Sequence, residues 1–194
     1  MSSLRARIGY LGIADFDYLS ARLLLLHGFV STGLPKAAEA FEKLIKLFLI
    51  LEAKITRNEE LTTRNLKEYG HDLITLFGAL KTKVPATFPP EWDEYLKLLQ
   101  ESYDRRYPEH WRQVQIEVSV HELDSAYTYL RNNVIQNFPP EEADRARHFG
   151  TFIYDAYTPQ LREVVERLGG KPPDQVLRQS NQSFESLDIE PSRL

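Results

Sequence analysis

Apolar residues between positions 35 and 56 recur at alternating spacings of four and three, the period of one face of an α-helix. The positions are Ala37, Phe41, Leu44, Phe48, Leu51 and Ile55. Two acid-before-base pairs four residues apart, each worth ~0.2–0.5 kcal/mol, support the same helix: Glu39 with Lys43 and Glu42 with Lys46. Since proline suits a first helical turn, the pattern predicts a helix that begins at about Pro35.

The same alternating spacing of apolar residues occurs upstream and predicts a preceding helix over residues 11–28. Its apolar positions are Leu11, Ala14, Tyr18, Ala21, Leu25 and Gly28. Leu23, Leu24 and Leu26 widen the apolar face, so we expect this helix to contact neighbours on two sides. It should end near residues 31–33, and the short connection predicts an antiparallel hairpin with the next helix.

Two further helices are predicted before residue 107. One covers residues 69–84, with a start between positions 63 and 70. The next follows the prolines at 89 and 90 and carries Trp92, Tyr95, Leu96, Leu99 and Tyr103 inward. It should stop at Arg106 or slightly earlier, because Pro108 disfavours helical geometry at Tyr107.

The last third of the chain mixes helical and loop signals. The alternating stretch IEVSV at 116–120 has no second strand to pair with, so we expect an extended linker. Ser119 and Glu122 have the spacing of a capping box and open a fifth helix. The stripes that follow are Leu123, Ala126, Tyr127, Leu130 and Val134, then Ala146, Phe149, Ile153 and Ala156, then Leu161, Val164, Val165 and Leu168.

These elements predict an all-α protein, an up-and-down helical bundle of five to six helices with a C-terminal helical extension. We expect one domain over residues 1–170, with the extension at 138–170. Residues 171–194 are poorer in apolar side chains and richer in proline, serine and glutamine, which predicts a flexible tail. No internal repeat is apparent.

Charge and composition exclude several function classes. A net charge of −4 argues against nucleic-acid binding driven by the charge of the whole protein, so any contact with phosphate must come from a local basic patch. The absence of cysteine excludes disulfides, cysteine zinc sites and thiol catalysis. The leucine run at 23–26 is far shorter than the ~20 residues that cross a bilayer, and no signal peptide is recognisable. We expect a cytoplasmic protein.

Several phrases in a fixed order resemble the HEPN family, small helical bundles named for nucleotide binding in higher eukaryotes and prokaryotes. The phrases are YLSARLLLLHGFV, PKAAEAFEKLIKLFL, GHDLITLF and RYP. The resemblance covers roughly residues 10–137 and leaves the last helices and the tail without a family counterpart. It implies a domain, usually homodimeric, that binds nucleotides, RNA or partners, often in toxin–antitoxin, defence or RNA-processing systems, where an antitoxin-like protein is a possible partner.

The resemblance also implies a candidate catalytic pair, because ribonuclease members carry an arginine followed after four to six residues by a histidine. Arg105 and His110 match this spacing. In that metal-independent chemistry, histidine assists proton transfer while the ribose 2′-hydroxyl attacks phosphorus, and arginine neutralises the developing charge. Arg106 departs from the pattern, since a polar residue such as asparagine or aspartate often follows the arginine there. The alternative is a pair of cations, Arg105 and Arg106, at a helix C-terminus.

Other positions are candidate ligand contacts. They are Arg106 and Tyr107 in the RYP phrase, His71 and Asp72 at the start of the third helix, and Glu42, Lys43 and Lys46 in the second. Their alternatives are structural: a helix start for His71 and Asp72, and a solvated face with helix ion pairs for Glu42, Lys43 and Lys46. No metal site is expected, because no two histidines have helical ligand spacing, and no cofactor is implied.

A second hypothesis is a non-catalytic protein-interaction module. The wide face of the first helix would mediate homodimerisation, and the tail would recruit a partner. Phe184, Leu187 and Ile189 lie among polar residues there, as expected of a segment that orders on binding.

Overall fold

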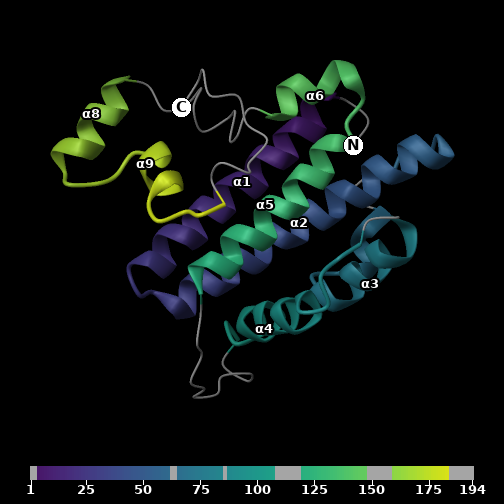
Figure 1. Cartoon of the computed structure of the whole chain (residues 1–194), viewed down its shortest axis with the longest axis horizontal. Coiled ribbons are helices and arrows are strands. Elements are labelled where there is room, and N and C mark those ends of the chain that lie inside the picture. The colour runs from purple at the N-terminus through teal and green to yellow at the C-terminus, as the bar shows by residue number, and fades with distance from the viewer. Residues whose placement is uncertain (1–3, 62–64, 85–86, 108–118, 148–158, 184–194) are drawn as a thin grey trace.

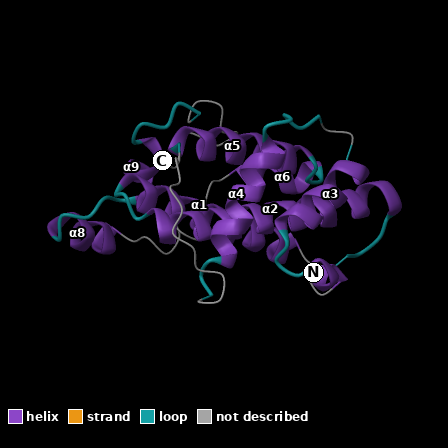
Figure 2. Ribbon diagram, turned by 90° about the horizontal axis from the view of Figure 1, so that it is seen from below, coloured by secondary structure: helices purple, strands orange, loops and turns teal. Residues whose placement is uncertain are grey.

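The computed structural model describes residues 4–61, 65–84, 87–107, 119–147 and 159–183, and every regular element in these ranges is helical. The α-helices are α1 (Leu4–Leu26), α2 (Val30–Arg57), α3 (Leu73–Lys83), α4 (Trp92–Asp104), α5 (Val120–Gln136), α6 (Pro140–Arg147), α8 (Pro159–Arg167) and α9 (Pro173–Arg178), and a 3₁₀ helix covers Asn65–Tyr69. The predicted all-α bundle is confirmed (Figure 1, Figure 2). None of the described helices combines the length and the hydropathy needed to cross a bilayer.

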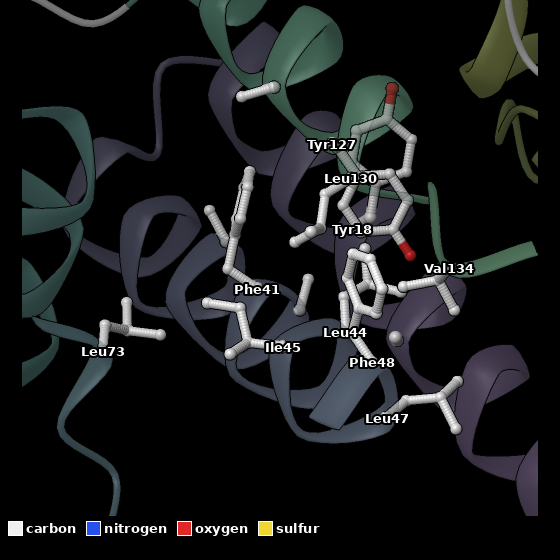
Figure 3. Close-up of a cluster of buried hydrophobic side chains, with 14 of the residues drawn as sticks. Tyr18, Phe41, Leu44, Ile45, Leu47, Phe48, Leu73, Tyr127, Leu130 and Val134 are labelled. Carbon is white, nitrogen blue, oxygen red and sulfur yellow. The ribbon is translucent and has the colours of Figure 1, made fainter. Parts of the chain in front are cut away.

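Helix α2 is the centre of the bundle. It packs against α1, α3, α4 and α5, with α3 and α4 along one side of it (Figure 1). Most of its side chains between Gly33 and Ala53 are buried, as expected of a helix that is apolar around most of its circumference. Figure 3 shows its core residues together with those of α5: Phe41, Leu44, Ile45, Leu47 and Phe48 with Tyr127, Leu130 and Val134.

The α1–α2 hairpin is tighter than the sequence indicated. Helix α2 begins at Val30 and not at Pro35, so the proline lies inside the helix. Gly28 makes the turn with a left-handed φ of +78°, and a Cβ at Gly33 would come within 2.8 Å of the Leu25 side chain. The two glycines therefore allow the helix ends to meet closely.

Two other boundaries follow from capping. Helix α3 begins at Leu73 because the Asp72 side chain accepts hydrogen bonds from the backbone N–H groups of Ile74 and Thr75, at 2.9 and 3.0 Å. The predicted cap at Ser119 is confirmed, since its hydroxyl oxygen accepts from the Glu122 N–H. Helix α4 ends at Asp104, as expected ahead of Pro108.

Some expectations about burial differ from the structure. Ile55 is 54% exposed because α2 extends beyond the helices that pack on it (Figure 1). Residues 173–183 lie in the expected flexible tail, yet they include α9, whose Val176 and Leu177 are buried. Residues 184–194, which include Phe184, Leu187 and Ile189, lie outside the described residues, as do 116–118 and the predicted core positions Phe149, Ile153 and Ala156.

Candidate ligand-binding site

A cluster of charged and aromatic side chains gathers where α2 meets the turn at residues 70–71 and the end of α4. We call it the α2–α4 polar cluster. It comprises Asp17, Lys36, Glu39, Glu42, Lys43, Lys46, His71, Tyr103 and Arg106. The residues come from four separate segments of the chain, and four lysine and arginine side chains face three carboxylates.

Glu42 is the centre of one half of the cluster. Lys46 Nζ donates to Glu42 Oε1 and to the Gly70 carbonyl, both at 2.7 Å, and His71 Nδ1 lies 2.9 Å from Glu42 Oε2. Glu42 and Lys46 are each only 7% exposed, whereas the His71 side chain is 67% exposed. The buried pair thus holds the turn at residue 70 and presents the histidine ring to solvent.

Tyr103 and Arg106 form the other half. The Arg106 guanidinium lies 3.4 Å from the centroid of the Tyr103 ring, its Nε donates to the Tyr103 carbonyl, and its Nη1 lies 3.2 Å from Glu39 Oε1. The His71 ring is 5.9 Å from the Tyr103 ring. Histidine, tyrosine and arginine therefore stand next to one another on one surface.

The inner edge of the cluster ties α2 to α1. Lys43 Nζ lies 2.5 Å from Asp17 Oδ2, and Lys36 pairs with both Asp17 and Glu39. Burial alone would lower the pKa of Lys36, but its hydrogen bond to Glu39 and the nearby carboxylates raise it above its ordinary value. The Glu39–Lys43 pair predicted from the sequence is wrong, because Lys43 turns to Asp17 and reaches only the backbone carbonyl of Glu39.

The cluster also affects the pKa of a tyrosine on α1. Burial and the Glu42 carboxylate together raise the pKa of Tyr10 to about 12. The phenol therefore stays neutral at physiological pH.

The structure brings together most of the predicted ligand contacts. Glu42, Lys43, Lys46, His71 and Arg106 all belong to the cluster, and Tyr107 is 52% exposed beside Arg106, with its ring centroid 5.8 Å from the guanidinium. Asp72 serves instead as the cap of α3, and its hydrogen bonds to Thr75 and Ile74 lower its pKa against the opposing effect of burial.

The predicted catalytic pair is only half described. Arg105 Nη2 lies 3.3 Å from Glu101 Oε2 on the preceding turn of α4, which is the helix-end arrangement expected of a structural cation. His110 lies outside the described residues. Catalysis by Arg105 and His110 therefore stays a prediction.

Sequence reasoning missed four members of the cluster: Asp17, Lys36, Glu39 and Tyr103. The signal for Tyr103 was its place three residues before Arg106 on a helix end, where an aromatic ring and a cation meet. Asp17 gave no such signal, because its partner Lys43 lies 26 positions along the chain.

A second polar network lies inside the bundle. The spacing Asp-x-x-Tyr-x-x-x-Arg occurs on α1 at Asp15, Tyr18 and Arg22, and again on α5 at Asp124, Tyr127 and Arg131. We call the two copies the twin motif. All six residues are completely buried, so this network is structural.

The two copies of the twin motif pair with each other. Arg22 donates to both oxygens of Asp124, at 2.8 and 3.0 Å, and Arg131 donates to both oxygens of Asp15, at 2.9 and 3.2 Å. Each arginine also holds a later segment: Arg22 donates to the carbonyls of Val176 and Gln179 at α9, and Arg131 donates to the Ala146 carbonyl at the end of α6. The expectation that the chain has no internal repeat therefore overlooked this short motif, which aligns α1 with α5 and anchors two C-terminal helices.

Comparisons of this chain with models of protein families, with curated proteins and with solved structures find no match. Within the described residues, no group of histidine and acidic side chains is arranged to hold a metal ion.

Proposed function

We propose that this chain is a HEPN-like helical domain that binds a nucleotide or RNA at the α2–α4 polar cluster. One observation carries the proposal: His71, Tyr103 and Arg106, from two segments, form a partly exposed row of ring, ring and guanidinium. Aromatic rings provide stacking surfaces for bases, and a guanidinium matches the geometry of phosphate oxygens. The row therefore offers both contacts that a nucleotide requires.

The ion pairs of the cluster differ in how readily a phosphate would replace them. The Arg106 side chain is 32% exposed and its bond to Glu39 is 3.2 Å long, a class of pair worth only ~0–1 kcal/mol. Lys46 is buried between Glu42 and the Gly70 carbonyl. We therefore assign Arg106 to the phosphate, with Lys46 holding the turn that carries His71.

The test is equilibrium binding of ATP, GTP and a fluorescently labelled RNA of mixed sequence. Arg106→Ala should weaken binding about tenfold or more, because a hydrogen bond to a charged group contributes ~1.5–3 kcal/mol. His71→Ala should weaken it by a smaller factor through lost stacking. Neither substitution removes a buried side chain, so the circular dichroism spectrum should not change.

Lys81→Ala is a matched control. Lys81 Nζ lies 4.9 Å from the centroid of the Phe77 ring and 2.6 Å from Asp93 Oδ1, and its side chain is 40% exposed. It therefore repeats the cation, ring and carboxylate arrangement of Arg106 away from the cluster. Equal loss of binding in Lys81→Ala and Arg106→Ala, or no binding by the wild-type protein, would overturn the proposal.

Ribonuclease activity is the alternative, and it has its own test. A labelled RNA would be incubated in EDTA with the wild type, Arg105→Ala and His110→Ala. Cleavage that both substitutions abolish would replace binding with catalysis as the function. From the family resemblance we also propose a role in a defence, toxin–antitoxin or RNA-related system, in which an antitoxin-like protein would be the partner.

A further inference from the structure

Glu39 is the carboxylate of the α2–α4 polar cluster that is shared between two partly exposed cations. Its Oε1 lies 3.2 Å from Arg106 Nη1, and its Oε2 lies 2.6 Å from Lys36 Nζ. The side chains of Glu39, Lys36 and Arg106 are 21%, 38% and 32% exposed. A ligand that arrives from solvent can therefore reach all three.

The other two carboxylates of the cluster are buried and bind other cations. Glu42 is 7% exposed and binds Lys46, which is equally buried. Asp17 is 6% exposed and lies 2.5 Å from Lys43, a pair that joins α1 to α2. Loss of either carboxylate would leave its lysine without that anion, so neither is free to respond to a ligand.

Glu39, in contrast, can release Arg106 without leaving a charge unpaired. The carboxylate would keep Lys36 as its counter-ion. Arg106 would keep the Tyr103 ring, whose centroid is 3.4 Å from the guanidinium, and the hydrogen bond from its Nε to the Tyr103 carbonyl. The guanidinium therefore stays in place while its Nη1 exchanges one anion for another.

We propose that Glu39 is a built-in anion that competes with the ligand phosphate for Arg106 and so sets the affinity and the charge selectivity of the site. The inference rests on the proposed ligand-binding function and adds its regulation. A guanidinium binds carboxylate and phosphate oxygens through the same N–H donors, so the Arg106 Nη1 donor that Glu39 occupies is withheld from the ligand.

The displaced Glu39 carboxylate also selects among ligands by their charge. It remains beside Arg106, where it repels every additional negative charge that a ligand carries. A polyphosphate should therefore be disfavoured more strongly than a single phosphate group. Glu39 thus favours a ligand that brings few charges to the cluster.

The direction of the effect separates competition from a structural role. If Glu39 only anchored Arg106 at the edge of the cluster, removal of its charge would loosen the guanidinium and weaken binding. If Glu39 competes with the ligand, the same change should strengthen binding. Glu39→Gln makes the comparison, because glutamine keeps the size of the side chain and an oxygen acceptor for Arg106.

The test is equilibrium binding of AMP, ATP and the fluorescently labelled RNA to the full chain in EDTA. Glu39→Gln should bind AMP about two- to fivefold more tightly than the wild type, as expected when a partly exposed ion pair no longer competes. The gain should be larger for ATP, which carries more negative charge. Combining Glu39→Gln with Arg106→Ala should remove most of the gain.

Asp93→Asn is the matched control. It makes the same change in charge at a carboxylate that pairs with Lys81 at the other end of α4, and it should leave all three affinities unchanged. An equal gain in Asp93→Asn, or an undiminished gain without Arg106, would overturn the inference.

The same measurements distinguish failure of the inference from failure of the proposed function. Binding by the wild type that Arg106→Ala weakens and Glu39→Gln leaves unchanged or weaker would overturn the inference alone. No binding of any of the three probes by the wild type or by Glu39→Gln would overturn both.

Discussion

The rings of Tyr18 and Tyr127 stack with their centroids 4.1 Å apart and their planes within 2° of parallel (Figure 3). Each hydroxyl donates to the aspartate on the opposite helix: Tyr18 to Asp124 at 2.6 Å and Tyr127 to Asp15 at 2.8 Å. The stacked pair therefore lies at the centre of the twin motif, with an arginine–aspartate pair on either side. A shift of α1 along α5 would break both ion pairs at once, so the motif fixes the relative position of the two helices.

Removal of one carboxylate from the twin motif should strongly destabilise the fold. We expect Asp124→Ala to lower the free energy of unfolding by about 3–5 kcal/mol, because it leaves the buried Arg22 guanidinium without its anion. Asp15→Ala should have a similar effect through Arg131. Urea unfolding followed by circular dichroism measures both changes.

A double-mutant cycle separates the pair from its surroundings. Arg22→Met combined with Asp124→Ala should cost less than the sum of the single changes, by about 0.5–3 kcal/mol. Asp93→Ala, which removes a carboxylate from an exposed pair with Lys81, should change stability by only about 0.5 kcal/mol or less. Additive losses in the cycle would show that the two side chains do not act as a pair.

Stability should decrease in alkaline solution. Burial, followed by the adjacent aspartate, raises the pKa of Tyr18 and of Tyr127 well above the ordinary value of 10.0. The unfolded chain releases these two protons at about pH 10, whereas the folded chain retains them. The stabilisation is thus fully present below pH 10.0 and is lost as pH rises towards the folded-state values.

Urea unfolding at a series of pH values, together with the tyrosinate absorbance, tests this dependence. A Tyr18→Phe, Tyr127→Phe variant should be less stable at neutral pH, because it loses two buried hydrogen bonds, but its stability should decline less steeply above pH 10.0. An equally steep decline in the variant would refute the assignment to these two hydroxyl groups.

Two leucines near the C-terminus should respond very differently to truncation. Leu177 of α9 is completely buried, so Leu177→Ala should cost about 2–5 kcal/mol in the free energy of unfolding. Leu168, after α8, is 80% exposed, so Leu168→Ala should change stability by about 0.5 kcal/mol or less. Equal effects in thermal or urea unfolding would mean that α9 does not pack on the bundle.

The sequence predicted those parts of the fold that depend on local periodicity and capping. The stripe from Ala37 to Leu51 and the cap at Ser119 required no knowledge of distant residues. The start of α2 was misplaced because Pro35 is a favourable first-turn residue, whereas the preceding turn depends on the close contact between Gly33 and Leu25.

Long-range pairing accounts for what the sequence did not predict. Asp15, Arg22, Asp124 and Arg131 have the polarity of surface residues, and their burial follows only from partners 102 and 116 positions away. The candidate site was likewise predicted only in part, because its residues meet through long-range contacts. The family resemblance selected His71 and Arg106 singly, but the link between them through Tyr103 requires α4 to fold back against the turn at residue 70.

The twin motif also sets an order of events during protein synthesis. Helix α1 leaves the ribosome about 100 residues ahead of the α5 residues that neutralise it, so Asp15 and Arg22 must remain hydrated until then. The carbonyls of Val176 and Gln179 that complete the environment of Arg22 emerge still later. We therefore expect the nascent α1–α2 hairpin to remain loosely packed on the ribosome and to reach its final arrangement only after α9 has been made.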